Sequence, residues 1–383
     1  MGVGIANPQR ALEVAGDLVV SGTISGGAGM GSFRNRIING DMRIAQRGTS
    51  ATVTYSGFTS TMYFQLDRWG FYFGVGTFTI SQQTLAASDT PYQLGFSNSM
   101  RITSSPGTGV LYFEPLQKTE GYMTQDFNWG TSFGVPVTLS FWFKSLCTPG
   151  SVVSVSIRNA ASTYSYVTQF VVTSASTWQY YTFSIPPPPN GAAIGTGSNA
   201  SLYIEIGGID FRSSGLLTST LNSWVGGNYI SSTGATNILA TAGNYIEFTG
   251  VQLEKGTVAT PFEFRPYATE LQLCQRYYEK SYDQGVNPGT ATAVGVFSGV
   301  AGNPSGLQGP IFKVPKRADP IGAGVVYYSK AGTVNTLTNW SNDLDGSAIT
   351  GGGDYSQYGI RYLLASVTTG SIYYYQWTVS TEL

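Results

Sequence analysis

Short stretches in which apolar and polar residues alternate at every second position recur along the first two thirds of this chain. The clearest is LSFWFK at 139–144, and others lie at 68–73, 153–158 and 202–206. Because successive side chains of a strand point to opposite faces of its sheet, each stretch predicts a strand with one face in the core and one in water. Turn-forming residues separate the stretches, a pattern typical of a sandwich or jelly roll. The sequence therefore predicts an all-β fold.

Three parts of the chain differ in kind. Residues 31–265 carry the alternating stretches and predict a jelly-roll-like β-sandwich, and residues 266–383 predict a small C-terminal β domain. Residues 1–30 contain only two brief apolar runs, broken by Gly16 and Gly22. So few apolar residues cannot form a core within one chain, but several chains side by side could share one. We therefore expect a trimeric neck or an attachment segment there, with an unstructured tail as the alternative.

The C-terminal domain begins with one of the few helices that the sequence predicts. Residues 269–278 can form it, with Thr269 as the N-cap and Leu271, Cys274 and Tyr278 on one face. Strands separated by glycine-rich loops are then expected at 293–297, 311–314, 325–328, 359–364 and 371–379. With few aliphatic residues the core of this domain is thin, and assembly into a trimer would help to bury it.

Composition narrows the classes of function. Charged residues make up 11% of the chain, against about 25% in ordinary soluble proteins, which is typical of all-β extracellular or virion-surface proteins. A net charge of -1 gives no field that would draw the chain to nucleic acid or anionic lipid. No apolar run is long enough to span a bilayer, and the N-terminus lacks the order of basic and then apolar residues that a signal peptide has.

Cys147 and Cys274 are expected to be free and buried, with a single disulfide as the alternative.

The absence of histidine excludes several catalytic sites at once. Without imidazole the chain cannot form a Ser-His-Asp triad, a Cys-His pair or an HExxH zinc site. A glycosidase needs two carboxyl groups about 5 to 10 Å apart. The candidates for such a pair are Glu114, Asp126, Glu205, Asp210 and Glu247. Nothing in the sequence marks any two of them as a pair, so we expect no enzymatic activity and no catalytic residue.

Sugar binding is the chemistry that the alternating strands allow. Aromatic planes stack on the apolar faces of pyranose rings, and nearby polar side chains bind the hydroxyl groups. On the polar faces of the predicted strands, four residues could form such a site: Trp142, Arg158, Tyr203 and Glu205. Further aromatic residues expected in loops are Tyr164, Tyr166, Trp224 and Tyr229 in the sandwich, and Trp340, Tyr355 and Tyr358 in the C-terminal domain. For any single aromatic residue, packing at a subunit interface is the alternative.

Three stretches of the chain resemble a family of phage tail-fibre and virion-surface proteins. They are NRIINGDMRIAQRGTS at 35–50, LDRW at 66–69, and QLEKGTVATPFEFRPYATELQLCQRYYEKSY at 252–282. The closing QWTVSTEL also fits, and the first 30 residues resemble the necks of phage fibres. Proteins of this family combine a carbohydrate-binding-like β-sandwich with a small C-terminal β tip.

The resemblance implies a virion protein that attaches the particle to its host. It implies a homotrimer whose N-terminal segment binds other tail or capsid proteins, and whose sandwich and tip bind host-surface glycans. Several weak sites on one particle would then give strong attachment through avidity. A capsid decoration protein, head fibre or fibre shaft without sugar binding is the first alternative. A polysaccharide-degrading tailspike is the second, and the lack of β-helix repeats argues against it.

The same resemblance implies a structural calcium ion as the one expected cofactor. Carbohydrate-binding jelly rolls often hold Ca²⁺ near their first and last strands, and Asp41 and Glu254 are the nearest ligands here. The alternative at Asp41 is a local turn hydrogen bond or an ion pair with Arg43 or Arg68 inside the fold. That alternative makes the NGDM and LDRW motifs part of the scaffold.

Overall fold

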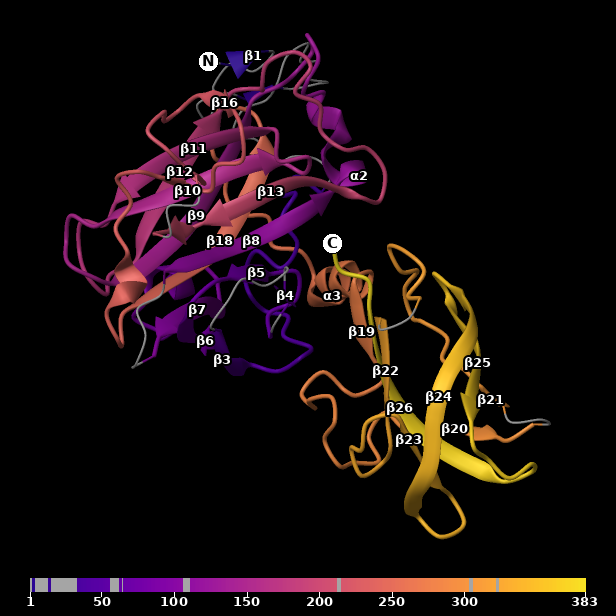
Figure 1. The fold of residues 1–383 in the computed structure, drawn as a ribbon. Coiled ribbons are helices and arrows are strands. Elements are labelled where there is room, and N and C mark those ends of the chain that lie inside the picture. The colour runs from indigo at the N-terminus through magenta and orange to yellow at the C-terminus, as the bar shows by residue number, and fades with distance from the viewer. Residues whose placement is uncertain are drawn as a thin grey trace.

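Two bodies make up the part of the chain that the computed structural model describes (Figure 1). That part consists of residues 2–3, 13–14, 33–55, 62–63, 65–105, 111–211, 215–302, 306–321 and 324–383. Of the predicted N-terminal segment it includes only β1 (Gly2–Val3) and β2 (Glu13–Val14), which pair in parallel. The neck expected at 1–30 otherwise lies outside the described residues. None of the described helices is long and apolar enough to cross a membrane.

The larger body is a sandwich of two antiparallel sheets. The six-stranded sheet has the order β12 (Gln179–Ile185), β9 (Val137–Leu146), β18 (Tyr245–Lys255), β7 (Asn98–Ser104), β6 (Gly76–Thr84) and β3 (Ser50–Tyr55). The eight-stranded sheet has the order β16 (Trp224–Gly226), β11 (Tyr164–Val171), β10 (Val152–Asn159), β13 (Ala200–Ile206), β8 (Tyr112–Glu120), β5 (Gly70–Phe73) and β4 (Met62–Tyr63), with β14 (Ile209–Asp210) also on β8.

Short elements complete the sandwich. They are the helices α1 (Thr90–Gln93) and α2 (Gly121–Thr124), the 3-10 helices η1 (Gln125–Phe127) and η2 (Ile238–Ala240), and the parallel pair β15 (Leu217–Thr218) and β17 (Ser231–Ser232). The last of these lie within residues 215–243, which are rich in glycine, serine, threonine and asparagine. The strands β15, β16 and β17 of this region are only two or three residues long, which is too short to show a periodic pattern.

The core between the two sheets follows the alternation seen in the sequence. Phe141 and Phe143 on β9 face Ile157 on β10, and all three belong to one buried apolar cluster. Trp69 is fully buried in the same cluster, with its ring 5.3 Å from that of Phe248 in an edge-to-face contact. The prediction of an all-β sandwich is confirmed.

The outer face of the eight-stranded sheet differs from the expectation that it lies in water. Arg158 and Glu205 point outward but are only 3% and 0% exposed. The segment 227–232, which follows the edge strand β16, covers this face and is held there by polar contacts, such as the Ser232 amide donating to Oγ of Ser154 at 3.0 Å. Alternation therefore identifies the inward side chains correctly but not the later segment that covers the outward ones.

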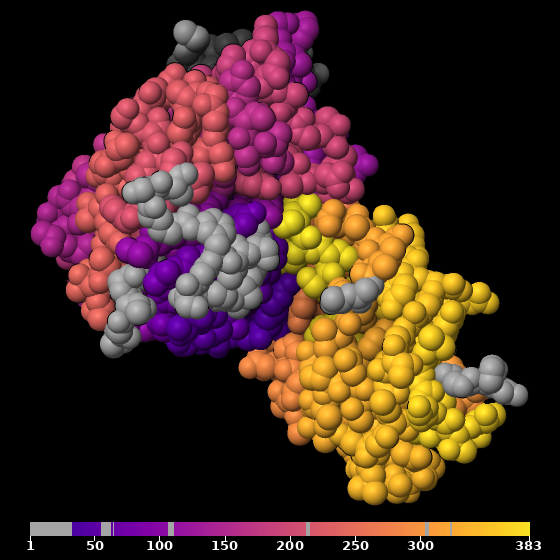
Figure 2. Space-filling model, in the orientation of Figure 1, coloured from indigo at the N-terminus to yellow at the C-terminus, as the bar shows by residue number. Residues whose placement is uncertain are grey.

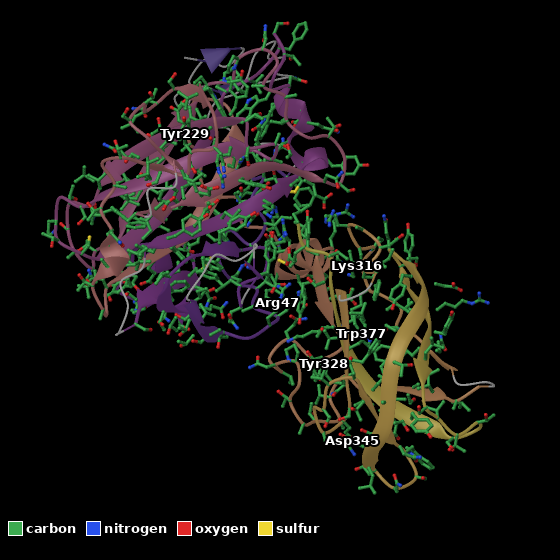
Figure 3. The ribbon with its side chains drawn as sticks, viewed as in Figure 1. Arg47, Tyr229, Lys316, Tyr328, Asp345 and Trp377 are labelled. Carbon is green, nitrogen blue, oxygen red and sulfur yellow. The ribbon has the colours of Figure 1, made fainter. Side chains whose placement is uncertain are left out.

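The smaller body is built around β26 (Ile372–Ser380). Its sheet has the order β19 (Tyr278–Lys280), β26, β23 (Thr336–Asn339), β24 (Leu344–Ser356), β25 (Gly359–Ala365) and β21 (Gly306–Gln308), with β20 (Phe297–Val300) and β22 (Val325–Tyr328) also paired to β26. A second buried cluster surrounds Trp377, which is fully buried and labelled in Figure 3.

The elements of this body agree with the sequence only in part. The strand expected at 325–328 is confirmed, whereas the stretch at 311–314 forms only an isolated bridge from Ile311. Helix α3 (Tyr267–Gln275) begins two residues before the expected cap, with Pro266 as its N-cap residue. Thr269 is therefore inside the helix, and Tyr278 belongs to β19 rather than to the helical face.

Ion pairs whose carboxylates are buried join the two bodies. The carboxylate of Glu382 contacts Arg68 and lies 3.1 Å from Nη2 of Arg47 on the sandwich. Arg276 at the end of α3 donates to Glu120 of β8 at 2.8 Å. Figure 2 shows the yellow C-terminal atoms against the sandwich, and in Figure 3 Arg47 lies near α3 at this junction.

Candidate functional site

A groove lined by aromatic side chains lies on the outer face of the six-stranded sheet. Its volume is about 390 Å³. The ten residues that line it, which we call the aromatic groove, are Leu94, Phe96, Ser140, Trp142, Tyr180, Gly250, Thr260, Pro261, Phe262 and Phe264. They come from β9, β12 and β18, from the loop between α1 and β7, and from the loop after β18.

The rings of the aromatic groove form two groups. Trp142 on β9 lies directly opposite Tyr180 on β12, with ring centroids 5.2 Å apart. Phe96, Phe262 and Phe264 form a second group in which each pair of centroids is 4.9 Å apart. Tyr180 is 45% exposed and Phe264 46% exposed. The groove thus offers ring surface to a ligand from both groups.

Gly250 allows these two groups to meet. It has φ of +65° and lies at the bulge in β18 where the pairing with β9 shifts register. A Cβ atom at this position would lie 2.8 Å from the Phe96 ring and 3.3 Å from Trp142. A residue with a side chain would therefore displace the aromatic rings and strain the backbone.

Hydroxyl groups accompany the rings. Ser140, Tyr180 and Thr260 line the groove, and Oγ1 of Thr260 is held by a 2.6 Å hydrogen bond to Glu254. Flat apolar rings beside hydroxyl groups suit a pyranose, whose ring has apolar faces and a polar edge. The arrangement can therefore bind a sugar without any chemical step.

The sequence-predicted sugar residues do not all lie together. Trp142 is in the aromatic groove, whereas Arg158, Tyr203 and Glu205 lie on the opposite sheet of the sandwich. Tyr180, which the prediction missed, completes the stacking surface beside Trp142. Its strand could have been found from the alternation of Tyr181, Phe183 and Ile185, but Phe96, Phe262 and Phe264 come from loops without a periodic signal.

A buried ion cluster surrounds Arg158. Its guanidinium contacts the carboxylates of Glu114 and Glu205, and its Nε is 2.8 Å from Oε1 of Glu205. Burial raises the pKa of Glu205, while Arg158 opposes that shift and Glu114 adds to it. Beside this cluster, Nζ of Lys118 lies 5.1 Å from the centre of the Tyr203 ring. Tyr203 thus contacts protein cations in this structure.

Two of the five candidate catalytic carboxylates come together. Glu114 and Glu205 are 2% and 0% exposed, and both contact Nη2 of Arg158. A glycosidase needs a gap between its carboxyl groups for the scissile bond and access for the substrate. Here the two carboxyl groups lie within hydrogen-bonding reach of each other beside the same buried guanidinium, so no such gap separates them. Asp126 instead pairs with Arg36, and Glu247 with Arg101.

The residues expected to bind calcium have protein partners of their own. Asp41 forms an ion pair with Arg43, one of the pairings that the sequence predicts. Glu254 accepts hydrogen bonds from the amide and hydroxyl of Thr260 and lies 3.5 Å from Nε of Arg34. Calcium takes six to eight oxygen ligands, and no group of three or more acidic, cysteine or histidine side chains suited to a metal occurs among the described residues.

The remaining predicted aromatic residues are distributed over both bodies. Tyr164, Tyr166 and Trp224 lie in strands β11 and β16 rather than in loops, and Tyr355 lies in β24. Tyr229 is in a loop, as expected. Trp340 and Tyr358 are 56% and 67% exposed on the smaller body. Both cysteines are free and buried, as expected.

Comparisons with known proteins identify no family. No protein-family model and no curated protein matches the chain. Among solved structures, tailspike protein 4 of bacteriophage CBA120 matches with 12% identity over 64% of this chain and a TM-score of 0.29. This chain covers a quarter (25%) of that tailspike structure.

Two carbohydrate-binding modules are also among the matches. TmCBM61, solved with β-1,4-galactotriose, matches with 9% identity over 58% of this chain and all (100%) of the module, with a TM-score of 0.27. A family 11 module from Clostridium thermocellum matches with 13% identity over 54% of this chain and 99% of the module, with a TM-score of 0.25. Matches this distant carry no argument about the site, which stands on its own geometry.

Proposed function

We propose that this protein is a non-catalytic glycan-binding subunit of a virion fibre, and that it attaches the particle to sugars on the host surface. The observation that carries the glycan binding is the aromatic groove, with Trp142 and Tyr180 side by side at its open face. Stacking of a pyranose on such rings and hydrogen bonding to the adjacent hydroxyls need no catalytic group.

The sequence supports the proposal that this protein is part of a virion fibre. The motifs at 35–50, 66–69 and 252–282 resemble those of phage fibre proteins, and the same resemblance supports a homotrimer attached through residues 1–30. A trimer would present three grooves, so that contacts of about millimolar affinity add up to firm attachment. A structural calcium ion remains a prediction from that resemblance.

Binding to oligosaccharides and to host cells tests the proposal. We expect the purified full-length protein to bind a subset of an immobilised oligosaccharide panel, and to bind host cells in a way that the same free oligosaccharides abolish. If the protein assembles onto particles but binds no saccharide and no host cell, the glycan-binding proposal is wrong. The first alternative, a decoration protein, would then take its place.

A further inference from the structure

We propose that the aromatic groove selects uncharged oligosaccharides over acidic ones, an inference that rests on the proposed glycan binding. None of the ten residues that line the groove carries a charge. Sugar acids and phosphorylated sugars are usually held by arginine or lysine, because a carboxylate brought into an apolar site without a cation loses its hydration. The groove offers such a ligand no cation.

Arg34, which lies beside the groove-lining loop after β18, already has protein partners. Nη2 of Arg34 donates to the carbonyl oxygen of Pro261 at 2.8 Å, and its Nε lies 3.5 Å from Glu254. Glu254 is only 1% exposed and accepts hydrogen bonds from Thr260 in the groove lining. The fixed charge nearest Thr260 is therefore a paired carboxylate, and an incoming anion would meet repulsion there.

A second basic residue on this face is also paired. Lys144 lies two residues after Trp142 on β9, and its Nζ is 4.5 Å from the centre of the Trp178 ring. The same Nζ lies 3.5 Å from Glu247 and 3.9 Å from Asp89. Two carboxylates thus already surround this ammonium group, which is mostly buried, so it cannot serve as a free anion partner.

A neutral sugar meets none of these obstacles. Its hydroxyl groups can exchange hydrogen bonds with Ser140, Tyr180 and Thr260, and its ring faces can contact Trp142. A purely apolar ligand that covered the Tyr180 hydroxyl would offer it no hydrogen bond in place of water, which costs binding free energy. Charge and polarity together therefore favour a neutral oligosaccharide.

Matched oligosaccharides test the selection. The full-length protein would be titrated with cellotetraose, β-1,4-galactotetraose and maltotetraose, each beside its counterpart oxidised to a carboxylate at C6. We expect at least one neutral chain to bind, and its oxidised counterpart to bind at least tenfold more weakly. Equal or tighter binding of an oxidised chain overturns the inference and leaves glycan binding intact. Binding of no saccharide in either arm contradicts glycan binding itself.

A designed cation provides the second test. Leu94 is 54% exposed on the groove wall, so Leu94→Lys adds a positive charge with little effect on packing, and Leu94→Gln is the matched neutral control. We expect the lysine variant to bind the oxidised chain about twofold to fivefold more tightly than the glutamine variant, and salt near 1 M to remove that gain. Equal binding by the two folded variants would show that charge does not exclude acidic sugars.

Discussion

At the scale of single residues, Gly250 links the fold to the groove. Its left-handed backbone conformation creates the bulge in β18, and its missing side chain leaves room for Phe96 against Trp142. One residue thus sets both the course of a central strand and the spacing of the rings on its outer face.

Replacement of Gly250 by alanine tests this role. We expect Gly250→Ala to lower the free energy of unfolding by about 1–2 kcal/mol for the positive φ, plus about 1–3 kcal/mol for the contact with Phe96. The matched control is Gly243→Ala, because Gly243 also has a positive φ, +83°, but a Cβ atom added there would have no atom within 4 Å. Urea unfolding of both variants measures the difference. Equal destabilisation would show that the rings do not depend on Gly250.

At the scale of secondary-structure elements, the sequence predicts strands well where one face is apolar. The strands at 139–144, 153–158 and 202–206 are found because their inward residues fill the core. Strand β24 was missed because LDGSAITGGGDYS is rich in glycine and looks like a loop. It forms a strand because its first part, residues 344–348, pairs with β23 and its second part, residues 349–356, pairs with β25. Such pairing is a tertiary effect that local sequence does not encode.

The residues of the aromatic groove could be predicted less well than the strands, for a related reason. Periodicity shows that Trp142 points outward, but it does not show which strand lies beside β9. Tyr180 becomes its neighbour only through the pairing of β9 with β12. For the same reason Arg158 and Tyr203, which share the outward pattern, were grouped with Trp142 although they lie on the other sheet.

The contact between the final residues and the sandwich gives a prediction at this scale. Glu382→Gln removes the carboxylate that pairs with the buried Arg68, and leaving that guanidinium unpaired costs about 3–5 kcal/mol. We therefore expect this variant to unfold at a lower concentration of guanidinium chloride than the unaltered protein does. Asp354→Asn is the control, because its pair with Arg361 is exposed and contributes at most about 1 kcal/mol. Similar midpoints for the two variants would contradict the interdomain role of Glu382.

At the scale of the whole molecule, buried tyrosines predict a loss of stability at high pH. Burial raises the pKa of Tyr277, Tyr278 and Tyr375 above the value near 10 of an unfolded chain. Their contribution is fully present below pH 10 and is lost above it, because only the unfolded chain then releases these protons. Lys118, whose pKa burial lowers to about 8, has the opposite effect, but only between about pH 8 and 10.4.

Urea unfolding between pH 10.5 and 11.5 measures this effect. We expect stability to fall steeply, and Tyr277→Phe to reduce the slope by about 1.4 kcal/mol per pH unit, which corresponds to one proton. A slope that is flat, or unchanged by the substitution, would show that these phenols ionise as easily in the folded protein as in the unfolded one.

The proposed trimer is a second prediction at this scale. Several large apolar side chains are strongly exposed on the smaller body, among them Val300, Ile311, Ile321, Leu344 and Tyr358, and association would remove such surface from water. One chain has a mass of 40.9 kDa. We expect sedimentation at micromolar concentration to give three times that mass. A monomer with intact β-type circular dichroism would refute the trimer.

The measurement that tests the central claim most directly is a calorimetric titration of the full-length protein and its Trp142→Ala variant with the oligosaccharide that binds best. Loss of one stacking ring is worth about 1–3 kcal/mol by analogy with base stacking on aromatic residues, so we predict at least fivefold weaker binding. Trp340→Ala, which removes an exposed tryptophan from the smaller body, should bind as the unaltered protein does. Unchanged affinity in the Trp142→Ala variant would contradict a glycan site in the aromatic groove.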